Sequence, residues 1–278
     1  MKYADLHIHS TASDGSWTPA EVVHVAKEKG LSCIALADHD TVDGIEDAQK
    51  AGTELGVEVI PALEFSTLYR GGEVHMLGYC IDWRDNNLRT ELKKVADARL
   101  NRGQGMVVKL QELGIDIDWA EVKEIAGDGA VGRPHIAKAL LEKGYIKTMG
   151  EAFTAAYIGN GGRAYVERYQ MSPERAIQLT MDAGGVPVLA HPGFYKKNSR
   201  LEKEDIIHLV EHGVQGIEVW HTKHSEKDTH YYESIAWEAG LLMTGGSDCH
   251  GDNANEVLMG QIKLPYRYVE RLLAACGT

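Results

Sequence analysis

Short, nearly all-apolar runs alternate along the chain with longer amphipathic segments. Runs of this kind are typical of strands buried on both faces, and we predict strands at residues 1–6, 31–37, 57–65, 73–82, 185–190, 214–220 and 241–246. Helices are expected at residues 18–29, 42–55, 172–183, 202–212, 225–239 and 265–275. This alternation of strands and helices indicates an α/β fold. The connection between 57–65 and 73–82 is too short for a helix, so these two strands are expected to pair antiparallel.

The middle of the chain departs from this alternation. Its pattern is helical throughout, and helices are predicted at residues 87–113, 118–126, 134–144 and 148–158. Its charge differs as well: residues 84–170 contain 14 Lys and Arg against 12 Asp and Glu, a net charge of +2, which leaves 15 against 29, or −14, for the rest. We therefore divide the chain into an α/β domain, 1–83 and 171–278, and a helical insertion, 84–170. An anionic substrate is expected to place its non-reacting groups on the less acidic insertion.

Histidines and carboxylates recur where the predicted strands end. His7 and His9 follow the first strand, and alternate residues of a strand share one face, so both rings can reach a single ion. Asp248 and His250 repeat this spacing after the last strand. The further candidates at strand ends or in the adjoining loops are Asp14, Asp38, His39, Asp40, Glu64, His75, His191, Glu218 and His221. Because zinc and harder divalent ions accept such mixed ligands, the sequence predicts a metal centre.

The origin of these candidates indicates the architecture. Six of the seven principal strands end in a candidate ligand or acid, and β/α barrels build their sites from the carboxyl ends of several strands. A distorted seven-stranded β/α barrel with a helical insertion is therefore predicted. An open doubly wound sheet fits less well, because it concentrates its site at one switch point.

Composition narrows the class of protein. The chain has 278 residues with 44% hydrophobic content, enough for one large domain or a domain with an insertion. Its net charge of −12 argues against bulk attachment to nucleic acid, and we expect no stable binding of duplexes. No apolar run approaches the roughly 20 residues of a membrane helix, and no signal peptide is recognised. The four cysteines lack close or Cys-x-x-Cys spacing, which fits a reducing compartment, so a cytoplasmic protein without membrane partners is expected.

The motifs resemble the PHP (polymerase and histidinol phosphatase) domain in its stand-alone phosphoesterase branch. They run from the first strand to the last: His7-x-His9, Asp14, Asp38-His39-Asp40, Glu64, His75, Ala190-His191-Pro192 and Gly246-Ser247-Asp248-x-His250, with Gly132-Arg133-Pro134-His135 in the insertion. The resemblance implies a distorted seven-stranded barrel with three divalent ions. Mn²⁺ is the first expectation, with Fe, Zn, Co or Mg as alternatives. The implied ligands are His7, His9, Glu64 and Asp248 for one ion, the bridging Glu64 with His75 and His191 for a second, and Asp14, His39 and His250 for a third.

The chemistry of such a centre is hydrolysis. Adjacent cations lower the pKa of a water between them, so hydroxide is available near neutral pH and no protein nucleophile is required. The general acid stays open among His191, His221 and His224. The resemblance further implies that the insertion caps the metal site, with Arg99, Arg102, Arg133 and His135 contacting a nucleotide's 5′-phosphate. Without the resemblance, arginines at this spacing are typical of a solvated helix face. Arg163, Phe153 and Tyr157 are left open as substrate contacts.

Within the branch, the resemblance is to bacterial 3′,5′-nucleoside bisphosphate phosphatases, some of which also trim short RNA from the 5′ end. It implies release of the 3′-phosphate from a bisphosphate such as pAp, giving AMP, and stepwise release of 5′-mononucleotides from short oligoribonucleotides. Three alternatives stay open: a histidinol-phosphate-type or other small phosphomonoesterase, an amidohydrolase-type metal hydrolase, and a non-catalytic metal-binding accessory domain. The second is disfavoured because no bridging lysine is found at a strand end.

Overall fold

The computed structural model describes residues 2–127, 131–167, 169, 171–194, 201–252 and 257–277. The chain divides into two compact units, which we call the barrel unit (Met1–Thr90 and Gln170–Thr278) and the insertion unit (Glu91–Tyr169). The first boundary is predicted after residue 83. In the structure it falls inside helix α3 (Asn86–Glu112), because this helix begins in the barrel unit and continues without a break into the insertion unit.

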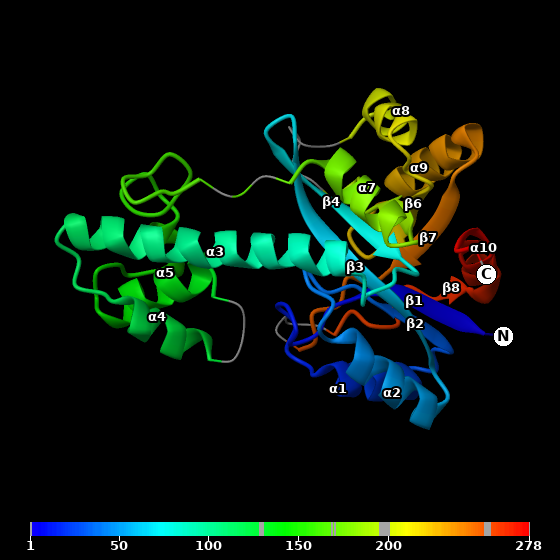
Figure 1. Cartoon of the computed structure of the whole chain (residues 1–278), viewed down its shortest axis with the longest axis horizontal. Coiled ribbons are helices and arrows are strands. Elements are labelled where there is room, and N and C mark those ends of the chain that lie inside the picture. The colour runs from blue at the N-terminus through cyan, green and yellow to red at the C-terminus, as the bar shows by residue number, and fades with distance from the viewer. Residues whose placement is uncertain are drawn as a thin grey trace. The chain divides into compact units, whose positions relative to one another are not determined.

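One eight-stranded sheet forms the barrel unit, in the order β7-β6-β5-β4-β3-β2-β1-β8 (Figure 1). The strands are β1 (Tyr3–Ile8), β2 (Cys33–Leu36), β3 (Glu58–Tyr69), β4 (Gly72–Tyr79), β5 (Val186–Leu189), β6 (Gly216–His221), β7 (Leu242–Gly246) and β8 (Leu264–Pro265). β1, β2 and β3 are mutually parallel, as are β5, β6 and β7, whereas β4 is antiparallel to both β3 and β5. The predicted antiparallel pairing of β3 and β4 is confirmed.

The helices surround the sheet of the barrel unit and build the insertion unit. In the barrel unit they are α1 (Pro19–Glu28), α2 (Ile45–Leu55), α7 (Pro173–Asp182), α8 (Lys203–Glu211), α9 (Glu226–Ala239) and α10 (Tyr266–Ala275). In the insertion unit, α4 (Trp119–Ala126), α5 (Arg133–Glu142) and α6 (Met149–Ala152) follow α3. This unit has a hydrophobic core of its own, which includes Met106, Leu110, Ile136 and Leu140.

The two ends of the sheet meet where β1 approaches the segment that follows β7. The N–H of Asp248 donates to the carbonyl of His7 at 2.9 Å, and the N–H of His9 donates to the carbonyl of Cys249 at 2.9 Å. Gly246 permits this approach, since a Cβ there would lie 2.3 Å from the Cβ of His7. The predicted barrel is therefore confirmed as a nearly closed one. The structure adds β8, which pairs antiparallel with the start of β1 and was missed because two residues carry no periodic signal.

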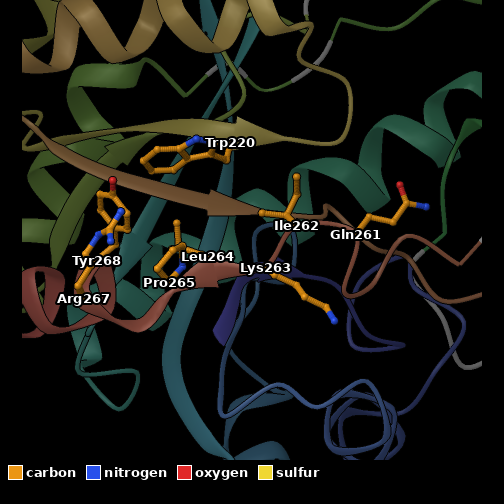
Figure 2. A pocket seen from close by; sticks show the side chains of 8 residues that line it. All are labelled: Trp220, Gln261, Ile262, Lys263, Leu264, Pro265, Arg267 and Tyr268. Atoms are coloured by element: carbon orange, nitrogen blue, oxygen red, sulfur yellow. The ribbon is translucent and has the colours of Figure 1, made fainter. Parts of the chain in front are cut away.

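Beside β8 lies a pocket of about 260 Å³. Trp220 of β6 and Tyr268 of α10 wall it with rings 4.7 Å apart, and Lys263 and Arg267 supply positive charge (Figure 2). Gly245 underlies Trp220, because a Cβ there would lie 2.9 Å from the Cβ of the tryptophan. None of the predicted metal ligands lines this pocket, so it is separate from the candidate chemistry.

Some predicted elements end at a different residue than expected. β3 continues to Tyr69 because it pairs along its length with β4 in a hairpin, whereas β4 stops at Tyr79, since Cys80 adopts a left-handed φ of 56°. The predicted helix at 148–158 is wrong beyond Ala152. There the chain forms successive turns that bury Ile158 in the insertion core, and Gly159 is required because a Cβ would lie 2.3 Å from the carbonyl oxygen of Phe153.

The cysteines also differ from expectation. Cys80 and Cys276 form a disulfide across a sequence separation of 196 residues, whereas Cys33 and Cys249 are buried free thiols. Spacing along the chain carries no information about this pair, because the fold brings the end of β4 to the end of α10. The inference of a reducing compartment from cysteine spacing therefore loses its support, and the cytoplasmic location stays a prediction. Within the described ranges, no helix combines the length and apolarity needed to cross a bilayer.

The disulfide predicts a defined thiol count. Denatured, unreduced protein should expose two titratable thiols per chain, from Cys33 and Cys249, and four after reduction. Replacing Cys276→Ser should lower the free energy of unfolding by about 2–5 kcal/mol in the absence of reductant. Reduced wild-type protein is the control, because it should match the variant. Four thiols in the unreduced protein would contradict the pairing.

Candidate metal centre

Glu64 of β3 lies among histidines contributed by neighbouring strands. Its side chain is fully buried. Its Oε2 atom lies 3.2 Å from Nε2 of His7, 3.3 Å from Nε2 of His9 and 3.2 Å from Nδ1 of His39. His7 belongs to β1, His9 follows that strand and His39 follows β2, so two neighbouring parallel strands deliver three rings to one carboxylate oxygen.

The other oxygen of Glu64 faces a second pair of histidines. Oε1 lies 2.8 Å from Nδ1 of His75 and 2.8 Å from Nε2 of His191. His191 follows β5, but His75 lies within β4, where it pairs with Ser66 of β3. Because β4 runs against its neighbours, its early residues lie at the edge where the parallel strands end. A residue in the middle of a strand therefore reaches the same place as residues that follow strands.

Asp248, just after β7, supplies a second carboxylate. Its Oδ1 atom lies 3.1 Å from Nε2 of His9 and 3.7 Å from Nε2 of His7. Its Oδ2 atom lies 3.5 Å from Nε2 of His221. The residue adopts a φ of 56°, an uncommon conformation that other constraints must hold. The hydrogen bond from its N–H to His7 is one such constraint.

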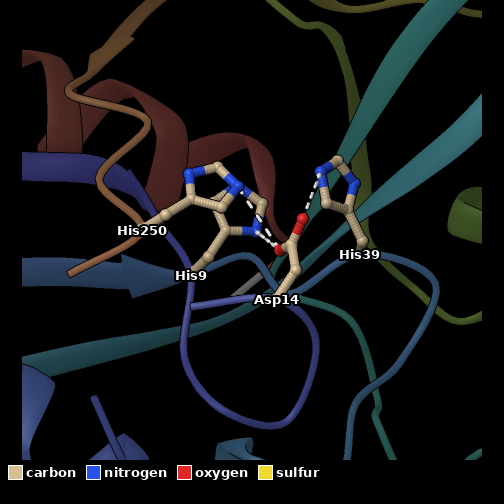
Figure 3. A group of neighbouring side chains, drawn as sticks. All are labelled: His9, Asp14, His39 and His250. Atoms are coloured by element: carbon tan, nitrogen blue, oxygen red, sulfur yellow. Dashed lines mark ion pairs between the residues drawn. The ribbon is translucent and has the colours of Figure 1, made fainter. Parts of the chain in front are cut away.

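Asp14 supplies the third carboxylate, from the loop after β1. Figure 3 shows it between the ring of His39 on one side and the rings of His9 and His250 on the other. Its Oδ1 atom lies 3.3 Å from Nε2 of His250 and 3.9 Å from Nδ1 of His9, and Oδ2 lies 4.0 Å from Nε2 of His39. His9 and His39 thus each face different carboxylates with their two nitrogens.

The structure brings all nine predicted ligands together, in groups that overlap. Ligand atoms within 4.8 Å of one another form the groups His7/His9/Glu64/Asp248, His9/Asp14/His39/His250, His39/Glu64/His75 and His7/His191/Glu218. The first group equals one predicted ligand set, and the second contains another together with His9. The remaining predicted set is joined by the two contacts of Glu64 Oε1.

Several buried ring nitrogens and a carboxylate oxygen of these groups lack hydrogen-bond partners in the described part of the chain, which fits a metal site. Nε2 of His7, both ring nitrogens of His9, Nδ1 of His39 and Oε2 of Glu64 are buried without a hydrogen-bond partner among the described residues. Leaving such groups unsatisfied costs about 1–3 kcal/mol each, so native proteins rarely contain several together. A mixed imidazole and carboxylate set facing one space suits divalent cations.

Charge compensation explains the protonation of the cluster. Burial alone would lower the pKa of His9, but the carboxylates of Asp248 and Glu64 raise it to about 9. Burial also opposes protonation of His75, yet Glu64 raises the pKa of that ring to about 10. The pKa of His39 falls to about 3, chiefly because of burial. Protons on the histidines therefore balance the carboxylates, and a bound cation would take their place.

Glu218 is a buried carboxylate for which the sequence predicts no specific role. Its Oε1 atom lies 3.1 Å from Nδ1 of His7, and its Oε2 accepts the N–H of His191 at 2.8 Å. A carboxylate only accepts, so Nδ1 of His7 is the donor and Nε2 is left to face Glu64. Burial would raise the pKa of Glu218, but His7 holds it below its usual value. The sequence signal that could have indicated this role is a carboxylate within an otherwise apolar strand.

Asp38 and Asp40 hold the backbone in place. Asp38 accepts the N–H and the hydroxyl of Ser10, both at 2.7 Å, and the hydroxyl of Ser13 at 2.6 Å. Asp40 accepts the N–H of Ser66 at 2.9 Å. Of the motif 38–40, the histidine alone belongs to the ligand groups found among the described residues, while the two aspartates fix the loop after β1 and the path of β3.

The general-acid candidates differ in how their ring nitrogens are used. In His221, Nδ1 accepts the N–H of Lys223 at 3.1 Å, so the proton lies on Nε2, which faces Asp248. In His224, Nδ1 donates to the carbonyl of Val219 at 2.9 Å and Nε2 accepts the N–H of Gly193 at 3.1 Å. Both nitrogens of His224 are thus engaged by the backbone. His221 alone of this pair offers a proton toward the cluster.

The four predicted phosphate-binding residues belong to the insertion unit. Arg99 and Arg102 lie on α3, while Arg133 and His135 lie at the start of α5. Nε of Arg102 donates to the carbonyl of residue 166 at 2.8 Å. Nη1 of Arg133 donates to a side-chain oxygen of residue 160 at 3.4 Å. Nδ1 of His135 accepts the N–H of residue 132 at 2.9 Å, which leaves Nε2 with the proton.

The chain is similar to known proteins over most of its length. The PHP domain model matches residues 5–274. The chain is 33% identical to the 5′-3′ exoribonuclease Rnm of Salmonella typhimurium over 88% of this chain and 84% of that protein. It is also 33% identical to the 3′,5′-nucleoside bisphosphate phosphatase of Chromobacterium violaceum, over 92% of this chain and 91% of that one.

A solved structure extends the likeness to three dimensions. A candidate metal-dependent phosphoesterase from Bifidobacterium adolescentis matches with a TM-score of 0.84 and 31% identity, covering 99% of this chain and 96% of that chain. The family match begins at Asp5, ahead of the first histidine pair, and extends past His250. The chain therefore belongs to the PHP domain family.

Proposed function

We propose that this protein removes the 3′-phosphate of a 3′,5′-nucleoside bisphosphate, converting pAp to AMP and phosphate, and releases 5′-mononucleotides from short oligoribonucleotides. As a member of its family, the chain is a metal-dependent phosphoesterase, and the substrate is what the proposal adds. The observation that carries it is the convergence of histidines and carboxylates on Glu64. Relatives that span most of the chain and are named for these two activities support the choice.

The proposed ligands form three sets, two of which share Glu64. They are His7, His9, Glu64 and Asp248; Glu64, His75 and His191; and Asp14, His39 and His250. Each set contains a carboxylate, which suits Mn²⁺, while the imidazoles also accept Fe, Zn or Co. The bridging role of Glu64 is supported by its two oxygens, which face different histidines.

The residues of the chain divide the work of hydrolysis. Divalent ions, when bound, lower the pKa of a water and offset charge on phosphoryl oxygens. Glu218 holds the ring of His7 in the orientation that presents Nε2 to the cluster. His221 is the proposed general acid for the leaving oxygen, because its Nδ1 accepts a backbone N–H and its proton therefore lies on Nε2.

The second phosphate of the substrate is assigned to the insertion unit. Arg99, Arg102 and Arg133 supply guanidinium groups suited to phosphate oxygens, and His135 supplies an N–H donor from Nε2. Burial lowers the pKa of His135, with the charge of Lys138 acting in the same direction, so the ring is a neutral donor. The positive net charge of residues 84–170 within an acidic chain supports this assignment.

A phosphate-release panel tests the substrate. With Mn²⁺ supplied, the protein should release phosphate from pAp and leave AMP, should not attack AMP itself, and should shorten a 5′-phosphorylated RNA trimer from its 5′ end. Preferential hydrolysis of histidinol phosphate would favour the small phosphomonoesterase instead. Hydrolysis of amides or lactones alone would favour an amidohydrolase, and no turnover with metals loaded would favour an accessory domain.

The arginines of α3 should matter only for substrates with a 5′-phosphate. Replacing Arg99→Ala and Arg102→Ala together should raise KM for pAp by at least about 100-fold, since each loses a charge-assisted contact of about 1.5–3 kcal/mol. The matched substrate is 3′-AMP, which lacks the 5′-phosphate, and its kcat/KM should change less than about twofold. Equal losses on both substrates would contradict the assignment.

Glu64 should control the metal content. Glu64→Gln removes the charge that faces five histidines, so we expect at least one divalent ion fewer per chain and a loss of metal affinity of about 100-fold or more. Metal analysis after dialysis and kcat with Mn²⁺ measure the effect. Glu54→Gln, on the exposed face of α2, is the control. Unchanged metal content in the Glu64 variant would refute the bridging role.

Metal binding should release protons. Burial would lower the pKa of His7, but the carboxylates of Glu218 and Glu64 raise this pKa well above its usual value. The pKa is about 9 for His9 and about 10 for His75, so all three rings are protonated at pH 7.5 in metal-free protein. Ligands must lose these protons, so loading should release about three protons per chain, and affinity should rise as pH increases from 7 toward 9. Calorimetric titrations in buffers of different ionisation enthalpy count the protons. Heats that do not depend on the buffer would contradict the expectation.

A further inference from the structure

Phe194 presents an aromatic ring to solvent directly beside the metal-ligand cluster. Its side chain is 51% exposed, yet its ring centroid lies 5.8 Å from that of His191 and 6.1 Å from that of His221. The planes of the Phe194 and His191 rings stand at 84°. An exposed phenyl ring gains little from folding, so its position beside charged and polar groups calls for another explanation.

The backbone that carries Phe194 is held firmly. The N–H of Phe194 donates to the carbonyl of His191 at 3.0 Å and closes a turn. The N–H of Gly193 donates to Nε2 of His224, whose Nδ1 donates in turn to the carbonyl of Val219 in β6. A Cβ on Gly193 would lie 3.0 Å from the ring of His224, so only glycine fits this contact without a shift. The turn therefore fixes where the backbone presents the ring before any ligand arrives.

The rings around Phe194 are also fixed. His191 and His221 are almost fully buried. His191 is anchored through Oε1 of Glu64, and His221 through the N–H of Lys223. One face of the local surface is thus a polar, metal-binding floor, and the adjoining surface is an apolar ring. A ligand that combines a phosphate ester with a planar apolar group matches both parts.

We propose that Phe194 is a stacking surface for the base of the nucleotide, and that His224 positions Phe194. The inference rests on the proposed function, since it assumes that the phosphate reacts at the metal cluster. Stacking on an aromatic side chain is tolerant of base identity, because every base has a π face. The site should therefore prefer nucleotides to phosphate esters without an aromatic group, with little discrimination among bases.

A double-mutant cycle between the ring and the base tests the proposal. The substrates are pAp and ribose 3,5-bisphosphate, which keeps both phosphates and lacks only the base. Phe194→Ala should lower kcat/KM for pAp about 10-fold to 100-fold, the range expected for loss of one stacked base. The loss should lie in KM, because stacking binds the ground state and the transition state alike. For ribose 3,5-bisphosphate the change should stay below about twofold.

Matched variants distinguish a loss of stacking from a general disturbance of the fold or the site. Phe194→Tyr keeps the ring and should retain wild-type kinetics, whereas Phe194→Leu keeps apolar volume and should lie between wild type and Phe194→Ala. Trp237→Ala removes another exposed aromatic ring, 70% exposed on α9, and should leave kcat/KM for both substrates unchanged. Equal losses on both substrates, or no loss on pAp, would overturn the role of Phe194.

A binding measurement keeps this inference distinct from the proposed function. Calorimetry with Mn²⁺-loaded protein compares AMP with ribose 5-phosphate, and Phe194→Ala should weaken AMP alone by about 10-fold or more. If the wild-type protein released no phosphate from any of the esters, the proposed function would be overturned. The binding comparison between AMP and ribose 5-phosphate would still test the stacking surface. Equal weakening of both ligands, or of neither, would reject it.

A separate variant tests the positioning role of His224, because the alternative is that this residue acts as the general acid. His224→Ala should raise KM for pAp in the same direction as Phe194→Ala, with kcat, metal content and the kinetics of ribose 3,5-bisphosphate unchanged. A fall in kcat on both substrates at full metal content, together with loss of the basic limb of the pH profile, would show that His224 donates a proton and would overturn its positioning role.

Discussion

The buried carboxylate of Glu64 is the constraint on which the site depends. A charge enclosed in a protein is costly unless opposite charges or metals meet it. Glu64 is fully buried, and five imidazole rings approach its two oxygens. These rings come from segments at the ends of β1, β2 and β5 and from β4, so the strands must meet at one edge for the charge to be tolerated. Near-closure of the sheet, with Gly246 seated against His7, satisfies that requirement.

The reversal of β4 makes the arrangement possible. A parallel β4 would carry the early residues of the strand, including His75, away from the other ligands, whereas the antiparallel strand places them at the shared edge. Carboxylates that are not among the proposed metal ligands complete the support. Glu218 orients His7, and Asp38 anchors the loop after β1 through two serines. The cluster is thus preorganised by groups that are not among the proposed metal ligands, which is how metal sites commonly fix their geometry.

Chemistry and selectivity are assigned to different parts of the chain. The barrel unit holds the proposed metal ligands and His221, while the turn that ends at Phe194 supplies an apolar surface beside them. The arginines proposed for the second phosphate belong to the insertion unit, which has a separate hydrophobic core. Substrate preference can therefore change through a loop or the insertion without disturbing the carboxylate balance around Glu64, as is common where binding residues lie outside a rigid scaffold.

The nine candidate ligands, most of the helices and the barrel class were predictable from the sequence, because strand ends, caps and the His-x-His spacing are local patterns. The family resemblance added the grouping of the ligands. Tertiary structure alone decided the rest. His221 and His224 look equivalent in sequence, yet the structure distinguishes them, because one nitrogen of His221 faces the cluster whereas both nitrogens of His224 are hydrogen-bonded to the backbone. The pairing of Cys80 with Cys276, the strand β8 and the role of Glu218 depend on which distant segments the barrel brings into contact. Local periodicity contains no such information, since these contacts exist only once the barrel has formed.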